Sequence, residues 1–549
     1  MKFMKNYTYR PALGLVFLVL GLILPSLMNA QTYQASYSEG NLSPEYGTSG
    51  KGNYTKDQSH LLLTGSLKEA NSIDGAYVPV LSLSYRGVID QQFVIKESSA
   101  TPGVNLEGIE VTDNGVGDLL VGIKRADANG LTTGVLASIN SSSSKLNWSQ
   151  ELEGVDLKGI SSHPRNGIVV AVGDGEDLLG QNDLRLVLLD PSGNLISARS
   201  FESGTTDGAT RVIALENEED WLVLGWQDDG ALNPLLMRLN RQGETEWNYR
   251  YEVQGQVASV DDIAYSQTLN QIAVVGTAIN DNRDSVLFVL LTDDAGQPLK
   301  VFYYGLEDRF QAVGKAIAAI EGLTDEAGFV LGGNLRVPSL GRFTRSLLVR
   351  IRPDGYPEWV RTYGPLDDGD IFSDGFSGLA FNRSLGTFAA TGFETEASRG
   401  SLDKFSFKAL QASTETGQAG ESYGFCSDRL EVRPDEGSAE STSAGYTRVR
   451  GGQSTSALSI SPIRWDVNYC SYPVRQGRQT TDIQELGSNS TIAREVFLYD
   501  LSGREVHQTT LQPGEVYAIP AVLPNGVYVA KYRSEGSWIG SDKLIKVRP

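Results

Sequence analysis

A repeat of about 50 residues constrains the fold of this chain more than any other feature. A short, apolar, strand-like run that ends in glycine occurs seven times, at intervals of 51 to 60 residues. The glycines that end these runs are Gly65, Gly122, Gly173, Gly225, Gly276, Gly332 and Gly392. A period of this length indicates one small supersecondary unit that is stacked many times, because such a unit cannot bury its own faces alone.

Each copy of the repeat contains four candidate strands. One apolar stretch precedes the glycine run, as in VDLKGI near Gly159, and two more follow it. The last two are joined by a tight turn of Asp, Asn, Pro and Gly residues, as in LVLLDPSGNLIS of the third copy. Four short strands in each of seven copies predict an all-β fold, a seven-bladed β-propeller over residues 31–412.

Two details of the array predict how the blades meet. The seventh copy lacks a convincing fourth strand, and the segment TYQASYS at residues 32–38 is predicted to supply it by pairing with the strand around Phe405. Trp148, Trp247 and Trp359 recur at the start of the last strand in alternate copies. This regular recurrence favours packing between blades over the alternative, a platform for a sugar or a cofactor.

The repeats resemble those of the seven-bladed β-propellers that are common in secreted bacterial proteins. The segments LRLVLLDPSGNLIS and LLVRIRPDGYPEW match that pattern best. The pattern overlaps with the repeats of quinoprotein propellers, but the sequence shows no set of residues that would hold a quinone cofactor. The Ser-x-Asp-x-Gly-x-Thr-Trp boxes of sialidase propellers are also absent from the sequence.

Residues 1–30 have the pattern of a secretory signal peptide. Three basic residues precede the apolar run from Ala12 to Leu24, and Ala30 is the expected cleavage point. An uncleaved membrane anchor is the alternative, and no other segment is apolar enough to span a bilayer. The chain has a net charge of −20, and removal of three basic residues would leave −23. This acidity argues against nucleic acid as a partner, and we expect a secreted or cell-surface protein.

The C-terminal residues 491–549 are predicted to form a small antiparallel β-sandwich with turns at residues 500–503 and 524–526. The motifs VFLYDLSGR and PNGVYV resemble the type A C-terminal sorting domain of the type IX secretion system of Bacteroidetes-type bacteria. The residues that carry this resemblance are Tyr499, Asp500, Gly503, Arg504, Asn525, Gly526, Tyr528 and Lys543. The resemblance implies export through an outer-membrane translocon that recognises this domain. The Pro-Asn-Pro opening of the family is absent, so removal of the domain after export stays open.

Residues 413–490 are rich in Gly, Ser, Thr and Glu and are predicted to be a linker or a small module. Cys426 and Cys470, the only two cysteines of the chain, bracket most of this segment. An exported protein meets oxidising conditions, so we expect a disulfide between them, with a reactive thiol pair as the alternative. Two cysteines and three histidines leave no room for a cysteine-rich metal cluster.

The loops that follow the repeated glycines occupy equivalent positions and should emerge on one face of the propeller. They are acidic in the third to fifth copies and basic in the sixth, a polarity that would select a charged ligand. Oxygen-rich loops also suit Ca²⁺, but none has the full order of a calcium-binding loop, so no cofactor is predicted. The candidate ligand residues are Asp174, Asp177, Trp226, Asp228, Asp229, Asp284, Arg336 and Arg342.

No catalytic motif appears in the sequence. Gly-x-Ser-x-Gly is absent, and no pair of carboxylates can be assigned the roles of acid and base. The sequence therefore favours a secreted or surface-displayed binding protein with an unidentified protein or glycan ligand. The alternatives are a polysaccharide hydrolase or lyase that uses loop carboxylates, and a structural spacer in a surface layer.

Overall fold

The computed structural model describes most of residues 33–414, with gaps of one to seven residues, the strands between residues 427 and 469, and four strands between 494 and 546. The expected signal peptide and both cysteines lie outside these residues. The described chain forms strands and turns, and none of its segments is a helix long and apolar enough to span a bilayer. The chain divides into two compact units, Met1–Cys470 and Ser471–Pro549.

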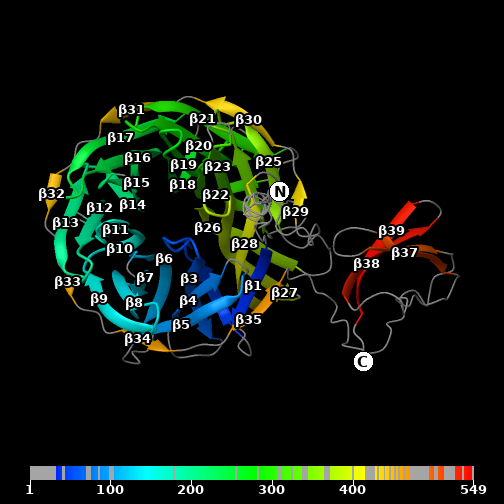
Figure 1. Ribbon diagram of the computed structural model, residues 1–549. Helices are drawn as coiled ribbons and strands as arrows, with labels where there is room; N and C mark the ends of the chain where they lie inside the picture. The colour runs from blue at the N-terminus through cyan, green and yellow to red at the C-terminus, as the bar shows by residue number, and fades with distance from the viewer. Residues whose placement is uncertain are drawn as a thin grey trace, which may run out of the picture. The chain divides into compact units, whose positions relative to one another are not determined.

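Seven sheets are arranged as the blades of a ring, which confirms the predicted seven-bladed propeller (Figure 1). The innermost strands of blades 1 to 7 are β2 (Pro44–Ser49), β6 (Asn105–Asp113), β10 (Asp156–Ser162), β14 (Thr206–Ala214), β18 (Gln256–Ser266), β22 (Gln311–Ile320) and β26 (Ile371–Asn382). The second strands are β3 (His60–Glu69), β7 (Asp118–Ala126), β11 (Val169–Glu176), β15 (Trp221–Asp228), β19 (Gln271–Ile279), β23 (Gly328–Arg336) and β27 (Thr387–Ser398). The third strands are β4 (Val78–Ser84), β8 (Thr132–Asn140), β12 (Asn182–Leu189), β16 (Leu232–Leu239), β20 (Ser285–Asp293), β24 (Thr344–Ile351) and β28 (Ser401–Ser413). The fourth strands are β5 (Ile89–Glu97), β9 (Lys145–Leu152), β13 (Leu195–Glu202), β17 (Thr245–Val253), β21 (Pro298–Leu306), β25 (Pro357–Tyr363) and, in blade 7, β1 (Tyr33–Glu39).

The repeated glycine of the sequence lies opposite a β-bulge in the innermost strand. Gly173 pairs with Leu157, where the register shifts, and a Cβ on Gly173 would lie 2.4 Å from the carbonyl oxygen of Asp156. The same pairing with a bulge recurs in blades 2 to 7. A bulge bends the strand and redirects a side chain. The glycine period therefore marks the positions where side chains turn toward the centre of the ring.

Neighbouring blades pack through aromatic rings that contact the turns of the next blade. The ring of Trp148 lies against Gly193, and its Nε1 donates a hydrogen bond to the carbonyl oxygen of Pro191 at 3.1 Å. Trp247 lies against the turn of blade 5, and Trp359 stacks on Phe388 of blade 7 with ring centroids 5.9 Å apart. The recurring tryptophans therefore serve packing between blades.

The N-terminal strand closes the ring. Strand β1 pairs antiparallel with β28, with Tyr33 opposite Gln411 and Tyr37 opposite Phe407. The last blade is thus built from both ends of the propeller, which is the pairing expected from the sequence. The hydrogen bonds between β1 and β28 close the ring within blade 7, whose strands come from the two ends of the propeller sequence.

The segment expected to be a linker or a separate module instead adds a fifth strand to the outer edge of every blade (Figure 1). We call these seven strands the belt. In chain order they are β29 (Ser427–Arg429), β30 (Val432–Gly437), β31 (Ala439–Ser443), β32 (Thr447–Val449), β33 (Gln453–Ser454), β34 (Leu458–Ser461) and β35 (Trp465–Tyr469). They pair with blades 6, 5, 4, 3, 2, 1 and 7, in that order. A strand that is held by backbone hydrogen bonds to a sheet edge needs no apolar alternation, so the sequence pattern did not show it.

The second unit contains one antiparallel sheet of four strands. They are β36 (Arg494–Tyr499), β37 (Glu505–Leu511), β38 (Gly526–Ser534) and β39 (Ser537–Lys546), in the order β37-β36-β38-β39. Val496 and Leu498 are fully buried. Tyr499, Gly526, Tyr528 and Lys543 of the predicted motif lie in these strands, whereas Asp500, Gly503, Arg504 and Asn525 lie outside the described residues. A second sheet, which a sandwich requires, stays a prediction.

Candidate functional site

A cavity of about 640 Å³ lies in the central channel of the propeller. It is lined by the second halves of the innermost strands and by the turns that follow them. The second strands run in the opposite direction, so the loops after the repeated glycines emerge at the other end of the channel. The cavity therefore lies on the face opposite the loops that the sequence analysis favoured.

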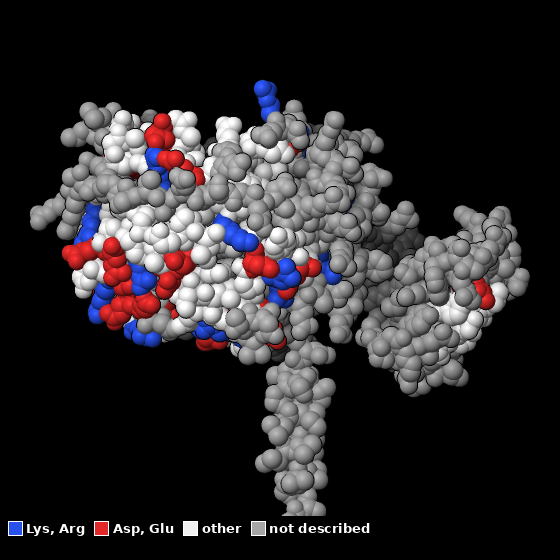
Figure 2. Space-filling view, turned by 90° about the horizontal axis from the view of Figure 1, so that it is seen from above, with Lys and Arg blue, Asp and Glu red and all other residues white. Residues whose placement is uncertain are grey.

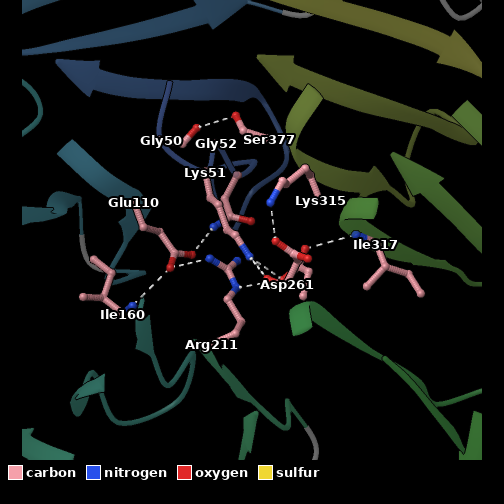
Figure 3. A network of polar contacts seen from close by, with 12 residues as sticks. Gly50, Lys51, Gly52, Glu110, Ile160, Arg211, Asp261, Lys315, Ile317 and Ser377 are labelled. Atoms are coloured by element: carbon pink, nitrogen blue, oxygen red, sulfur yellow. Dashed lines mark hydrogen bonds and ion pairs between the residues drawn. The ribbon is translucent and has the colours of Figure 1, made fainter. Parts of the chain in front are cut away.

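The inner end of the cavity is a cluster of four charged side chains from four blades, which we call the charge cluster. Its members are Lys51, just after β2, Glu110 of β6, Arg211 of β14 and Asp262 of β18. Lys51 Nζ lies 2.8 Å from Asp262 Oδ1, and Arg211 Nε lies 3.3 Å from the same oxygen. Arg211 also pairs with Glu110, so the charges alternate in sign across the channel (Figure 3).

One further side chain and two backbone N–H groups complete the charge cluster. Glu110 accepts hydrogen bonds from Asn53 Nδ2 at 2.9 Å and from the backbone N–H of Ile160 at 3.1 Å. Asp262 accepts one from the N–H of Ile317 at 3.0 Å. The side chains are at most 15% exposed. Burial raises the pKa of Glu110 against the pull of Arg211, and burial lowers the pKa of Lys51.

The wall of the cavity has an apolar side and a polar side. Blades 4 to 7 present half-buried apolar side chains, namely Ile213, Tyr265, Ala319 and Phe381. Blades 1 to 3 present Asn53, Thr112 and Ser161 at the corresponding depth. A pocket of this kind combines a large apolar contact area with a few polar groups that orient a ligand.

Two basic residues stand at the mouth on the polar side. Lys56 Nζ donates to Ser162 Oγ at 3.0 Å, and Arg165 is exposed on the turn after β10. Burial lowers the pKa of Lys56 to about 8, although Asp113 and Glu216 oppose this shift. Within the described chain, no carboxylate lies within ion-pair distance of either side chain. Positive charge is thus available to a ligand at this edge of the cavity.

The acidic residues at the mouth are already engaged. The Glu321 carboxylate accepts backbone N–H groups from Gln267 at 2.7 Å and Thr268 at 2.9 Å. Glu218 pairs with Arg238, and Glu216 lies 3.9 Å from Arg383. The local electrostatics on the polar side therefore favour an anionic group.

The residues that the sequence analysis favoured lie apart from the cavity. Asp174 is buried in β11, where its carboxylate lies 3.3 Å from Lys158 Nζ and accepts the N–H of Ala209 at 2.9 Å. Trp226 covers Gly208, and Asp229 pairs with Arg250. The other three candidate residues that the structure describes bond to groups close to them. Asp228 accepts the N–H of Gly230, and the N–H of Asp284 donates to the Asn280 side chain. The Arg336 guanidinium donates to the Gln311 side chain. Asp177 and Arg342 lie outside the described residues. Their role as a ligand face stays a prediction.

The described residues form neither a cluster of metal-ligating side chains nor, on the side drawn in Figure 2, a surface of one sign. Among the residues placed in the structure, no group of three or more His, Cys, Asp or Glu could hold a metal ion. Figure 2 shows acidic and basic side chains interleaved on the side of the ring that is in view. Such mixing gives little long-range attraction for a highly charged polymer.

The charge cluster was missed by sequence reasoning, although the repeat contains a signal for it. Glu110 pairs with the repeated Gly122. Arg211 and Asp262 come directly after the bulges that lie opposite the glycines of their blades. An alignment of the copies on their glycines would place Arg211 and Asp262 at the same position, 14 residues before the glycine, whereas Glu110 lies 12 residues before Gly122.

Comparison with known proteins gives little further information. No protein-family model matches the chain, and no curated protein matches it. Among solved structures, the crystal structure of Chaetomium thermophilum Raptor is similar over 78% of this chain and 33% of that one, with a TM-score of 0.39 and 12% identity. The chain thus spans about a third of that protein, and a likeness at this level says nothing about function.

Proposed function

We propose that this protein is an exported binding protein whose ligand occupies the central cavity. The observation that carries the proposal is the two-sided cavity, with an apolar wall from blades 4 to 7 opposite a polar wall with two cations that pair with no described carboxylate. The ligand class that fits is a small organic molecule with an apolar body and one anionic group. A volume of about 640 Å³ lies within the range of such sites.

The geometry gives less support to a polysaccharide hydrolase. Such an enzyme needs one carboxyl that donates a proton and a second that attacks or activates water. Glu110 and Asp262 line the cavity, but both are buried, ion-paired and bonded to backbone N–H groups. Their oxygens hold the charge cluster together and are not free for a substrate.

A binding titration tests the proposal. We expect one molecule of the apolar anion 8-anilinonaphthalene-1-sulfonate to bind per folded chain. Lys56→Gln should weaken binding about tenfold, because it removes one charge-assisted hydrogen bond. Phe381→Ser should weaken it by a similar factor through loss of apolar contact.

The matched control is Arg352→Gln, which removes an exposed cation on a turn at the periphery of the ring. This variant should bind the probe like the unaltered protein. Unchanged binding in both cavity variants, or equal loss in the control, would place the probe elsewhere and reject the cavity as the site.

Export remains part of the proposal and is supported by the sequence alone. Residues 1–30 would be removed as a signal peptide, and residues 491–549 would direct the chain through the type IX translocon to the cell surface. The intact mass of the protein, recovered from its native host, tests both ends at once. A mass that includes residues 1–30 would exclude the cleaved signal, and retention inside the cell would exclude the sorting role.

A further inference from the structure

The belt passes once around the whole ring in a single direction. Its seven strands meet blades 6, 5, 4, 3, 2, 1 and 7, and each runs antiparallel to the outer strand of its blade. The links between consecutive belt strands contain only one to three residues. So short a link can join strand ends that are about 14 Å apart at most. The belt must therefore pass directly from one blade to the next without turning back.

The belt has a regular step. Ser427, the first residue of β29, and Trp465, the first residue of β35, are 38 residues apart and are separated by six blade-to-blade steps. Each step thus takes about six residues, and a full circuit of seven blades takes about 44. Cys426 and Cys470 are 44 residues apart. The separation of the two cysteines along the chain therefore matches one circuit of the belt, which would place them close together.

The described neighbours of the two cysteines support this placement. Ser427 follows Cys426 and lies opposite Tyr363 at the end of β25 in blade 6. Tyr469 precedes Cys470 and lies opposite Ala35 near the start of β1 in blade 7. Blades 6 and 7 are adjacent, because β22, β23 and β24 all contact β26. The two ends of the belt therefore lie on adjacent blades.

We propose that Cys426 and Cys470 form a disulfide that closes the belt into a covalent hoop around the propeller. Two thiols lose two protons and two electrons as the S–S bond forms. The electrons reduce the disulfide of an oxidant, a thiol oxidoreductase in the cell or oxidised glutathione in vitro, to two thiols. The hoop encloses all seven blades and also covers β1, the strand on which closure of the ring depends.

The first test counts thiols in the full chain. After incubation with oxidised glutathione under native conditions, unfolded protein should react with no maleimide, and after reduction it should react with two equivalents. The oxidised protein should run as a monomer on a non-reducing gel. Two reactive thiols, or a disulfide-linked dimer, would overturn the proposal.

A second test asks whether the belt register places the cysteines together. The double variant Cys470→Ser/Ser461→Cys moves one thiol back by about one and a half blade steps, to β34 on blade 1. It should stay reduced under conditions that oxidise the natural pair. Equal oxidation of both proteins would show that a flexible segment, and not the belt circuit, brings the thiols together.

The hoop itself is tested by comparing one chain in two redox states, which avoids any folding defect of a variant. The oxidised protein should unfold at a higher urea concentration than the reduced protein, and reduced protein should match Cys426→Ser. Identical midpoints in the oxidised and reduced states would show that closure does not constrain the ring.

Discussion

The same substitution at two buried aspartates is expected to change stability in opposite directions. Asp207 and Asp374 both lie on innermost strands and accept a backbone N–H from the third strand of the preceding blade. The donor is Leu184 at 2.8 Å in one case and Ser346 at 2.6 Å in the other. Asp374 also lies 2.5 Å from the buried Lys408 Nζ. Asp207 bonds to the Ser203 hydroxyl, and no Lys or Arg of the described chain pairs with it.

The magnitude follows from the pKa of Asp207. Burial raises this pKa from 3.8 to about 6, which corresponds to roughly 3 kcal/mol in favour of the protonated form in the folded state. Because the folded pKa is the higher one, stability falls as the pH rises from about 4 to 6, and the loss is complete above pH 6. Asp207→Asn keeps the acceptor for Leu184 and removes the charge. It should therefore add up to about 3 kcal/mol at pH 8 and almost nothing at pH 4.

Asp374→Asn removes the one carboxylate of the described residues that pairs with Lys408, whose side chain is 1% exposed. A buried cation left without its partner typically costs about 3–5 kcal/mol. The double variant Lys408→Met/Asp374→Asn replaces the pair by uncharged groups and should recover most of this loss. Asp374 is therefore the matched control for Asp207: both carboxylates accept an equivalent backbone N–H from the preceding blade, but only Asp374 has a cationic partner in the described chain.

Urea denaturation followed by tryptophan fluorescence at pH 4.5, 6 and 8 measures these effects. The midpoint of Asp207→Asn should rise above that of the unaltered protein at pH 8, and by only about a third as much at pH 4.5. A lower midpoint at pH 8 would refute the reasoning, because it would mean that the carboxylate is better solvated or paired than its burial indicates.

Three further predictions concern the ring. Deletion of residues 31–40 removes β1 and should lower the thermal midpoint clearly, so an unchanged melting curve would contradict closure by that strand. Gly355 has φ +87° and its Cβ would lie 1.9 Å from a ring carbon of Phe302 in the preceding blade, whereas Gly386 has φ +61° and open space. In thermal denaturation, Gly355→Ala should cost about 3 kcal/mol and Gly386→Ala about 1 kcal/mol, and equal losses would exclude the clash as the cause. Arg211→Met leaves the buried Glu110 without its ion-pair partner, so it should cost about 3 kcal/mol or more, and the loss in urea titrations should grow with pH, because burial raises the pKa of Glu110 and favours its protonated form.

The blades could be predicted because one physical requirement recurs in each of them. The bulge of the innermost strand brings a backbone carbonyl against the second strand, and only glycine fits there, as at Gly173 and Gly225. The belt could not be predicted in the same way. Its strands have two to six residues and are held through backbone hydrogen bonds, so their composition resembles that of a linker.

The charge cluster was hidden for a different reason. Each member is a single charged residue in or beside an apolar strand, and its partners are far away in the chain. Lys51 and Asp262, for example, are 211 residues apart. Polar surface loops attract attention in a sequence because function often lies there. Here the loop residues mostly bind their own blades, whereas ring closure brings the isolated charges together.

The charge cluster and the belt connect blades that are not neighbours, so they restrict opening of the ring at a single blade boundary. Sheet packing and the aromatic contacts join each blade only to its two neighbours, so they would allow the ring to part at any one boundary. The charge cluster joins blade 1 to blade 5 and blade 2 to blade 4 through the channel, and the belt joins all seven blades at the rim. Separation at one boundary must therefore break contacts at distant blades as well, which makes opening cooperative. Residues of every blade line the cavity, so its shape depends on the blades staying together. The charge cluster holds them together in the channel, and the same bulges that require the repeated glycines position its members Arg211 and Asp262.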